Sequence, residues 1–376
     1  MTNPWSGKLS DSLAGKGRYS KLKEQLDSSI FNQNWYLADL QAAPTVEAPR
    51  FADLFSGAGG LSQGFREAGL NKVFSVEINP YASETIRYNF PESIHFDRPI
   101  EDLTTADLLT VAPSGALQVI CGGPPCQGFS VAGARRIDDP RNRMFLEFCR
   151  VVEICQPDFF VMENVPGILT MQKGEVYRAI LEQFGRIGYP NASVRILEAA
   201  DYGVPQLRAR AVFIGNRHGL PNPYPKPTHD KASYVPIEAA LDDIMSWPRS
   251  AATNHEWTAH SAAFEERISR VPPGGSLYET FRDAFKRQHI GVPSMAAKEN
   301  HGGTHIHHRL NRVLSARELA RLQTFPDDFY FCGGMKKAYW QIGNAVPCLL
   351  ARALGGALLD GLARVQTSRV ALAMSA

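Results

Sequence analysis

One cysteine in the chain, Cys126, stands where a nucleophile could work. It follows a Pro-Pro pair and comes shortly after the apolar run 117–121, whose Gly and Pro boundaries are typical of a buried strand. The thiol is therefore expected just past the carboxyl end of a strand, where open α/β sheets place their chemistry. A thiolate at such a place could form a covalent intermediate. The alternative is a thiol packed beside a turn, because free cysteine often behaves as a small buried hydrophobe.

A carboxyl group and a run of alternating polar residues could act beside that thiol. Residues 159–162 predict another buried strand, and Glu163 follows it as the thiol follows its own strand. Two such strands would bring the thiol and the carboxyl to one pocket, where the carboxyl could manage a proton. Gln206, Arg208 and Arg210 alternate, so on a strand their side chains share one face. The alternative is an edge strand whose polar residues face water.

The first strand-turn-helix unit suits a nucleoside. Residues 50–68 predict a strand, a glycine-rich turn at 56–60 and a helix, and glycine lets the backbone approach a ligand closely. The pyrophosphate-binding pattern fails because its third glycine position holds Ser62, so NAD is not expected. The next strand, 72–76, ends in Glu77, which is suitably placed to accept ribose hydroxyls. A plain structural turn and a solvated glutamate are the alternative.

Composition describes a globular protein in a reducing compartment. The chain has 376 residues, 44% of them hydrophobic and 21% charged, with a net charge of +2. That charge neither favours nor excludes DNA as a partner. We expect no membrane span, since no apolar run approaches about 20 residues, and no signal peptide. The six cysteines form no C-x-x-C pair, which indicates a reducing cytoplasm.

The length suggests about two domains. We expect an N-terminal extension at 1–50, a first domain at 51–218, a second domain at 219–311 that is rich in Pro, Gly and His, and a segment at 312–376 that returns to the first domain. Residues 90–103 are expected to be irregular.

Two local patterns lie in the second half of the chain. His301, His305, His307 and His308 invite a zinc site, but no cysteine lies near and the spacing fits no zinc finger, so no metal is expected. Ser315 and the glutamate three residues later predict a capping box at the start of a helix, and residues 349–365 predict an apolar helix that packs on the sheet.

Taken in order, these stretches resemble a DNA (cytosine-5) methyltransferase of the bacterial restriction-modification type, over residues 51 to about 362. The matching motifs are DLFSGAGG at 53–60, PCQ at 125–127, ENV at 163–165, QxRxR at 206–210, RE with RLQ at 317–323, and GNAVP at 343–347. Six motifs in family order are far more specific than any one of them.

The resemblance implies a class I S-adenosylmethionine-dependent methyltransferase fold: an α/β, doubly wound, mostly parallel sheet with a smaller target-recognition domain at 219–311. It implies that Cys126 attacks C6 of a flipped-out cytosine, that Glu163 acts at the base's N3, and that Arg208 and Arg210 position Glu163 and the base. The cofactor S-adenosyl-L-methionine would be held by Phe55, Ser56, Gly57, Gly59, Gly60, Glu77, Ile78, Ile100, Pro124 and Asn344.

The resemblance also implies double-stranded DNA as the substrate, a monomeric enzyme and a cognate restriction endonuclease as a possible partner. The chain departs from the family where relatives usually carry an Asp near the adenine, since it has Pro99 there. It also lacks a clear Thr-Leu recognition element, which Thr304 and the nearby histidines could replace. Residues 131–143, which are rich in Arg, are the candidate lid over the flipped nucleotide. The alternatives are an RNA (tRNA) cytosine-5 methyltransferase and a catalytically silent DNA-binding relative.

Overall fold

The computed structural model describes residues 48–125, 143–280, 284–298 and 305–375, with side chains up to residue 371. Several of the predictions above fall outside these residues. They concern Cys126, nearly all of the Arg-rich stretch 131–143, His301, Thr304, and the extension up to residue 47.

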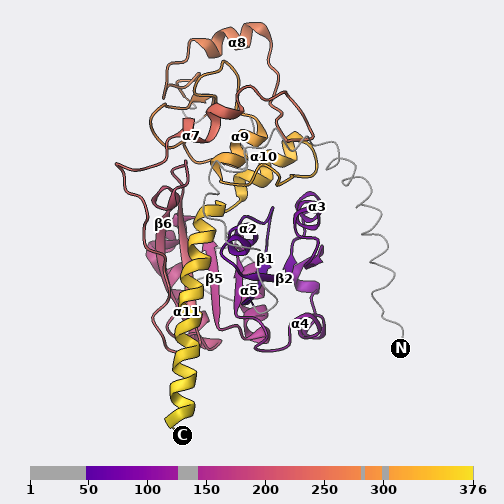
Figure 1. The fold of residues 1–376 in the computed structure, drawn as a ribbon, viewed down its shortest axis with the longest axis vertical. Coiled ribbons are helices and arrows are strands. Elements are labelled where there is room, and N and C mark those ends of the chain that lie inside the picture. Colours follow the sequence, from indigo (N-terminus) through magenta and orange to yellow (C-terminus); the bar gives the residue numbers. More distant parts are fainter. Residues whose placement is uncertain (1–47, 126–142, 281–283, 299–304, 376) are drawn as a thin grey trace, which may run out of the picture.

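A seven-stranded sheet forms the centre of the molecule (Figure 1), in the order β3-β2-β1-β4-β5-β7-β6. The first five strands of this order are parallel, whereas β7 is antiparallel to both β5 and β6. This arrangement confirms the doubly wound, mostly parallel α/β sheet. The strands are β1 (Arg50–Leu54), β2 (Asn71–Val76), β3 (Ile94–Phe96), β4 (Val119–Gly122), β5 (Phe159–Asn164), β6 (Ser193–Glu198) and β7 (Ala209–Asn216).

Helices cover both faces of the sheet. One core joins β1, β2, β4 and β5 to α4, α5 and α6, and a second core joins the opposite face to α2 and α11. These helices, with α3 beside them, are α2 (Gly60–Glu67), α3 (Pro80–Asn89), α4 (Thr105–Val111), α5 (Arg143–Cys155), α6 (Glu175–Arg186) and α11 (Cys348–Ser375). Short 3-10 helices occur at η2 (Ile100–Asp102), η5 (Pro166–Leu169), η6 (Met171–Gly174), η7 (Ala199–Tyr202) and η8 (Asp242–Ile244).

The prediction that residues 90–103 are irregular was wrong. The segment contains β3, which pairs in parallel with β2, and η2, which continues into the core through Ile100. The strand has only three residues, and Ile94 is exposed while Phe96 is buried. Backbone pairing at the edge of the sheet defines it, which a periodicity argument over so short a run does not detect.

The last helix packs on the sheet as predicted. Leu350, Leu354 and Leu358 of α11 are fully buried against β1, β4, β5 and α2. The helical stretch from Met335 to Ala371, which includes most of α11, is also long and apolar enough to cross a membrane, since its most apolar window has a mean hydropathy of 1.5, contrary to our expectation from the sequence. Because 61% of its most apolar window is buried inside the protein, the core of the fold accounts for this composition.

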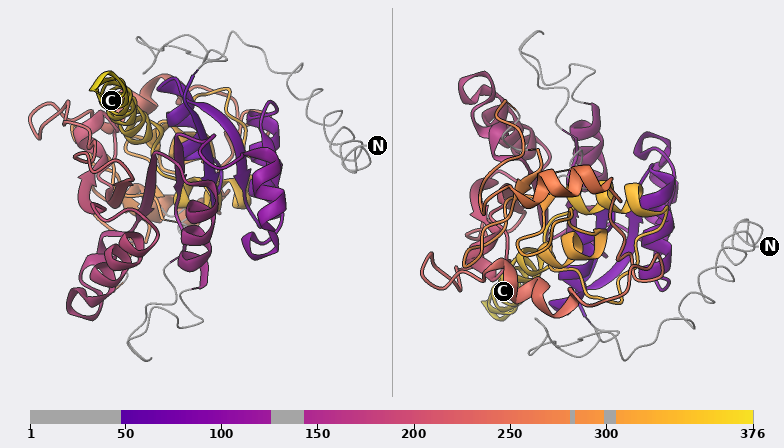
Figure 2. Two further views of the ribbon diagram at one scale, coloured as in Figure 1. Left: turned by 90° about the horizontal axis from the view of Figure 1, so that it is seen from below. Right: turned by 90° about the horizontal axis from the view of Figure 1, so that it is seen from above.

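A second group of elements lies beyond the carboxyl ends of the parallel strands, at the top of Figure 1 and seen from above in Figure 2. It contains α7 (Ile237–Leu241), α8 (Ala262–Ser269), α9 (Ala316–Leu322), α10 (Met335–Asn344) and the two-stranded sheet of β8 (Lys286–Arg287) and β9 (His305–Ile306). A third core joins α7, α9 and α10 to Ala58, Ile86 and Phe90 of the first domain. The turn after β1 therefore lies where the two groups meet.

Candidate active site

The turn between β1 and α2 has the backbone of a ligand-binding loop. Phe55, Gly57 and Gly59 have φ values of 56°, 52° and 88°, so left-handed residues alternate along the turn. A left-handed phenylalanine is strained by about 1–2 kcal/mol, and such strain gathers at functional sites. A Cβ built on Gly57 would have no described atom within 4 Å, whereas one on Gly60 would lie 2.2 Å from the Val346 carbonyl. Gly57 thus faces open space, and Gly60 packs against the turn that leads into α11.

Glu77 lies directly beneath that loop, at the end of β2. Its Oε2 accepts the Gly57 N–H at 2.8 Å, and its Oε1 accepts the Asn79 N–H at 2.7 Å. Burial raises the pKa of Glu77, and these backbone hydrogen bonds oppose the rise. The next residue, Ile78, is 66% exposed, so an apolar surface adjoins the carboxylate. The Ser56 N–H donates to the Val76 carbonyl at 3.1 Å, which ties the loop to the same strand.

Three further predicted cofactor contacts lie in different surroundings. Asn344 is exposed at the last position of α10. Pro124 is buried after β4, while Ile100 is only 3% exposed and belongs to the core of the sheet. Ile100 could therefore offer a ligand no more than a small edge of its side chain. The fit to a nucleoside cofactor rests on the open loop at Gly57 and on the carboxylate of Glu77.

Glu163 and Arg210 form an ion pair at the heart of the site. Arg210 Nε lies 2.5 Å from Glu163 Oε1, and each side chain is 13% exposed. Glu163 is the fifth residue of β5, whereas the sequence predicted it just after the strand. Arg210 lies in β7 next to Ala211, which pairs with Asn164 of β5. A Cβ on Gly123 would lie 3.1 Å from Glu163 Oε2. The carboxyl group therefore faces the turn that continues into Cys126.

Asn164 fixes that turn, a role that sequence reasoning missed. Its Nδ2 donates to the Pro124 carbonyl at 3.0 Å, and its Oδ1 accepts the Val165 N–H at 2.8 Å. The side chain is 8% exposed. The segment before Cys126 is thereby tied to the strand that carries Glu163. The asparagine belongs to the ENV motif, but its type alone gives no sign of which backbone carbonyl it would reach.

Gln206 and Arg208 differ from Arg210 in what they contact. Both residues precede β7, so the three side chains of the motif do not share one face of a strand. Gln206 and Arg208 are 0% and 3% exposed, which excludes an edge strand whose polar residues face water. Arg208 donates to the carbonyls of Ala297 and Gly343 at 2.5 and 2.7 Å. Burial and the nearby Arg210 lower the pKa of Arg208 to about 9, and Glu163 opposes this. Within the described residues, Arg210 is the arginine of the motif that pairs with Glu163.

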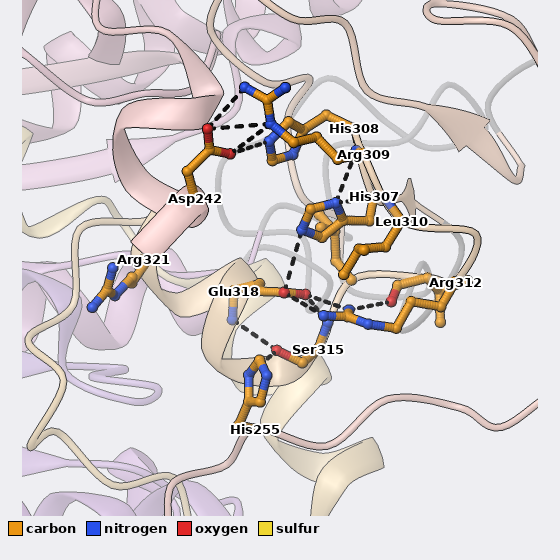
Figure 3. A network of polar contacts seen from close by, with 12 residues as sticks. Asp242, His255, His307, His308, Arg309, Leu310, Arg312, Ser315, Glu318 and Arg321 are labelled. Atoms are coloured by element: carbon orange, nitrogen blue, oxygen red, sulfur yellow. Dashed lines mark hydrogen bonds and ion pairs between the residues drawn. The ribbon is translucent and has the colours of Figure 1, made fainter. Parts of the chain in front are cut away.

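A network of buried and half-buried ionic groups surrounds the start of α9 (Figure 3). Glu318 accepts both terminal nitrogens of Arg312, at 2.7 and 2.8 Å, and the Ser315 N–H at 2.7 Å, and the Ser315 hydroxyl accepts the Glu318 N–H, which confirms the capping box. His308 Nε2 lies 2.7 Å from the Asp242 carboxylate, which also accepts Arg309. The network joins α9 to the segment that follows β9, and that segment to η8.

The histidines of this region do not face a DNA groove. His305, His307 and His308 are at most 3% exposed, so the proposal that they replace the missing recognition element was wrong for these three. His307 Nδ1 accepts the N–H groups of Arg309 and Leu310 at 3.0 and 3.1 Å, so its proton is on Nε2. Burial lowers the pKa of His307 to about 3. It is therefore neutral at pH 7, and its 3.5 Å approach to Glu318 is a weak N–H contact, not an ion pair.

The cysteines other than Cys126 are all described, and all are buried. Burial raises the pKa of the Cys155 thiol to about 11 and raises the pKa values of Cys121, Cys149 and Cys348 as well. Thiolates are the reactive form of cysteine. These buried thiols are consequently poor nucleophiles, which leaves Cys126 as the candidate.

Comparison with known proteins agrees with this geometry. The family model for C-5 cytosine-specific DNA methylases matches residues 49–360. The chain is 42% identical over 327 residues to the type II methyltransferase M1.HphI of Haemophilus parahaemolyticus, which covers 82% of this chain and 86% of that protein. It is 31% identical over 357 residues to the type II methyltransferase M.XorII of Xanthomonas oryzae, with coverages of 82% and 84%.

Solved structures show the same fold. A DNA modification methyltransferase candidate encoded within an E. coli prophage superposes with a TM-score of 0.69 at 26% identity, over 83% of this chain and 99% of that chain. A DNMT2 variant of Spodoptera frugiperda gives a TM-score of 0.60 at 20% identity over 83% of this chain, and at that identity it shows the fold alone. With the family model matched from residue 49 to residue 360, this chain belongs to the C-5 cytosine-specific DNA methylase family and is a DNA (cytosine-5-)-methyltransferase.

Proposed function

We propose that this chain methylates cytosine in double-stranded DNA through a covalent bond between Cys126 and C6 of the base. The observation that supports this most directly is the Glu163–Arg210 pair beside Gly123, because it places a fixed carboxyl group at the turn that continues into Cys126. A base stacked in a duplex exposes neither face of C6, so the target cytosine must leave the helix.

The chemistry explains why a thiol and a carboxyl group are needed together. C5 of cytosine is a weak nucleophile, and addition of the Cys126 thiolate at C6 moves an electron pair toward C5. Glu163 holds a proton at N3 as negative charge builds on the ring. Once C5 carries the methyl group, loss of the C5 proton returns the electron pair to the ring and expels the thiolate. Arg210 keeps the Glu163 carboxyl group in place throughout.

S-Adenosylmethionine, which the family implies as cofactor, supplies an electrophilic methyl group when it is bound. The residues present fit it, because Gly57 faces open space and Glu77 offers a carboxylate beneath the same loop. We propose that Glu77 accepts the ribose hydroxyls and that Phe55 and Ile78 contact the adenine. The backbone of Ser56, Gly59 and Gly60 would shape the loop, and Pro124, Asn344 and the edge of Ile100 would complete the pocket.

We further propose that residues 219–311 form the target-recognition domain and that the enzyme works as a monomer in the bacterial cytoplasm. Its type II relatives suggest a restriction-modification system, with a restriction endonuclease as partner. Arg208 is assigned to positioning and not to contact with the base, because its guanidinium donates to main-chain carbonyls.

Trapping with 5-fluorocytosine tests the proposal. Fluorine at C5 leaves no proton to remove, so after methyl transfer the adduct should persist as a denaturant-resistant complex. Its mass should equal protein plus duplex plus one methyl group, with the linkage at Cys126. Cys126→Ser should abolish trapping, while Cys149→Ala, a change at a buried thiol, should retain it. A linkage at another cysteine, or trapping in Cys126→Ser, would contradict the assignment. Turnover on tRNA but not on duplex DNA would favour the RNA alternative, and no turnover on either would favour a silent relative.

A further inference from the structure

Two side chains of the QxRxR motif hydrogen-bond to the region assigned to target recognition. Gln206 Oε1 accepts the Ala297 N–H at 3.0 Å, and Arg208 Nη1 donates to the Ala297 carbonyl at 2.5 Å. The backbone beside them adds two more contacts, because the Ser294 N–H donates to the Pro205 carbonyl and the Ser294 carbonyl accepts the Leu207 N–H, both at 2.9 Å. Ser294 and Ala297 lie in the region assigned to target recognition. Both peptide groups of Ala297 are therefore held by side chains of the catalytic domain.

The same two side chains also hydrogen-bond to the ends of α9 and α10. Arg208 Nη2 donates to the Gly343 carbonyl at 2.7 Å, one residue before Asn344. Gln206 Nε2 donates to the Leu322 carbonyl at 3.0 Å and lies 3.3 Å from Gln323 Oε1. Gln323 Nε2 in turn donates to the carbonyls of Ile342 and Ala345, at 2.8 and 3.2 Å. The turn between α10 and α11 packs on the turn between β1 and α2, where the Val346 carbonyl lies against Gly60.

We propose that Gln206 and Arg208 form a clamp that couples target recognition to the part of the proposed cofactor site that contains Asn344, an inference that rests on the proposed function. One guanidinium bonds two carbonyls that belong to different parts of the fold. Ala297 and Gly343 cannot move apart without the loss of a charge-assisted hydrogen bond in a buried site, where an unpaired polar group is costly. A shift of the recognition backbone on binding the correct sequence is thereby passed to Gly343 and Asn344. Gln206 and Arg208 are positioning residues, since their partners are protein atoms.

The clamp predicts reciprocal coupling between the two ligands. In the wild-type protein, S-adenosylhomocysteine should tighten binding of the target duplex, and the duplex should tighten binding of S-adenosylhomocysteine by the same factor. We expect a factor of roughly 5 to 150, the usual range for coupled sites. A duplex of scrambled sequence should give a smaller factor, because it would not move the recognition backbone in the same way.

Arg208→Lys is the informative variant. Lysine keeps the charge but lacks the planar fork that reaches two carbonyls at once. The coupling factor should fall toward one, while S-adenosylhomocysteine still binds the free protein. Gln206→Met removes the other half of the clamp at similar volume, and it should lower the coupling factor even if Arg208→Lys fails to fold.

Arg287→Lys serves as the matched control. Arg287 is also a buried arginine that donates to main-chain carbonyls, those of Ile268, Val271, His307 and Leu310, but all four lie within the second domain. A general effect of disturbing a buried arginine would appear there too. We expect this variant to weaken DNA binding and leave the coupling factor unchanged.

Bisulfite sequencing first identifies the target sequence. Isothermal titration calorimetry of S-adenosylhomocysteine and of the target duplex, each with and without the other, then measures the coupling factor on the full chain. A wild-type factor of one, an unchanged factor in Arg208→Lys and Gln206→Met, or an equal loss in Arg287→Lys would each overturn the clamp. If the wild-type chain methylates no cytosine in DNA, the proposed function fails and the clamp with it. Methylation without coupling would remove the clamp alone.

Discussion

Replacing Glu318 by glutamine should destabilise the fold around α9 far more than an ordinary capping mutation. The carboxylate is fully buried and faces Arg312, whose side chain is 11% exposed, through two hydrogen bonds of 2.7 and 2.8 Å. Glutamine is nearly the same size but is neutral. Its amide offers one acceptor oxygen where the carboxylate offers two, so Arg312 would be left buried without its counter-charge.

Two routes lead to a similar magnitude. Burial alone would raise the pKa of Glu318, but the hydrogen bond and the charge of Arg312, together with His307 and His255 where low pH protonates them, outweigh burial and lower it from 4.5 to about 2. A shift of that size corresponds to about 3 kcal/mol of stabilisation of the charged form. Removing one partner from a buried ion pair typically costs 3–5 kcal/mol. We therefore expect Glu318→Gln to lower the free energy of unfolding by about 3 kcal/mol near pH 7.

The chain contains a matched control in the capping box of α4. There Thr104 and Asp107 make the same reciprocal hydrogen bonds, at 3.0 and 3.1 Å, and Asp107 also pairs with an arginine, Arg98, but this box is nearer to water, since Thr104 is exposed and the Asp107 side chain is 16% exposed. Asp107→Asn should cost about 1 kcal/mol, the usual value of a helix cap. Urea unfolding followed by tryptophan fluorescence compares the two, since Trp257 lies under Arg312 at 4.2 Å.

The pH dependence has a definite sign. Because the pKa of Glu318 is lower in the folded state, its contribution is present above the unfolded value of 4.5 and is lost as pH falls toward about 2. The difference between wild type and Glu318→Gln should accordingly shrink over that interval. Equal losses in Glu318→Gln and Asp107→Asn, or a difference that does not depend on pH, would refute the assignment of the stabilisation to the buried ion pair.

Three more predictions follow from the site and its surroundings. The pKa of His307 falls from 6.5 to about 3 on folding. Below pH 6.5 the unfolded chain therefore binds a proton that the native state does not bind, which lowers the free energy of unfolding. Between about pH 7 and pH 5, unfolding titrations should show wild type losing about 2 kcal/mol more than His307→Asn, and equal losses in the two proteins would contradict this. Gly60→Ala should lower both the melting temperature and the cofactor affinity, because its Cβ would meet the Val346 carbonyl at 2.2 Å; Gly356→Ala in α11, with no described atom within 4 Å, should raise the melting temperature slightly. Arg210→Met should reduce the single-turnover methylation rate about 100-fold, the lower end of what proton management contributes, while leaving cofactor affinity unchanged; an unaltered rate would show that the ion pair with Glu163 is not needed.

The sequence predicted most of the sheet because parallel strands buried on both faces appear as short apolar runs between turns. It predicted the capping box at Ser315 for a similar reason, since cap and glutamate are three residues apart and interact locally. The strand β3 was missed because three residues are too few to show an alternation of apolar and polar side chains. The partners of Gln206 and Arg208 were missed because Ala297 and Gly343 lie 91 and 135 residues away and contribute only main-chain atoms.

Charged residues were harder to interpret than apolar ones. An alternating run such as 206–210 is compatible with a solvated edge or with a buried clamp, and the choice depends on what packs over it. The histidines near residue 305 show the same difficulty, because nothing in their spacing reveals the carboxylates of Asp242 and Glu318 to which they turn. Tertiary partners decide the role of a buried polar group, and those partners come from distant parts of the chain.

Asp53 illustrates how such a group can serve the active site without touching a ligand. It begins the DLFSG motif, yet it is 1% exposed and accepts the Ser62 hydroxyl at 2.6 Å, in the first turn of α2. Burial raises its pKa to about 6, against the opposing effect of Lys72, and burial lowers the pKa of Lys72 to about 8. Near pH 7 the Asp53 carboxylate therefore stays negative and the Lys72 ammonium stays positive, and the two opposite charges offset each other inside the core. Since α2 begins where the Phe55–Gly59 loop ends, the bond from Ser62 to Asp53 fixes the helix against β1 and so fixes the loop between them. The aspartate at the start of this motif thus acts from inside the core, at the end of the interior strand β1, and the strained loop beside it stays open at Gly57.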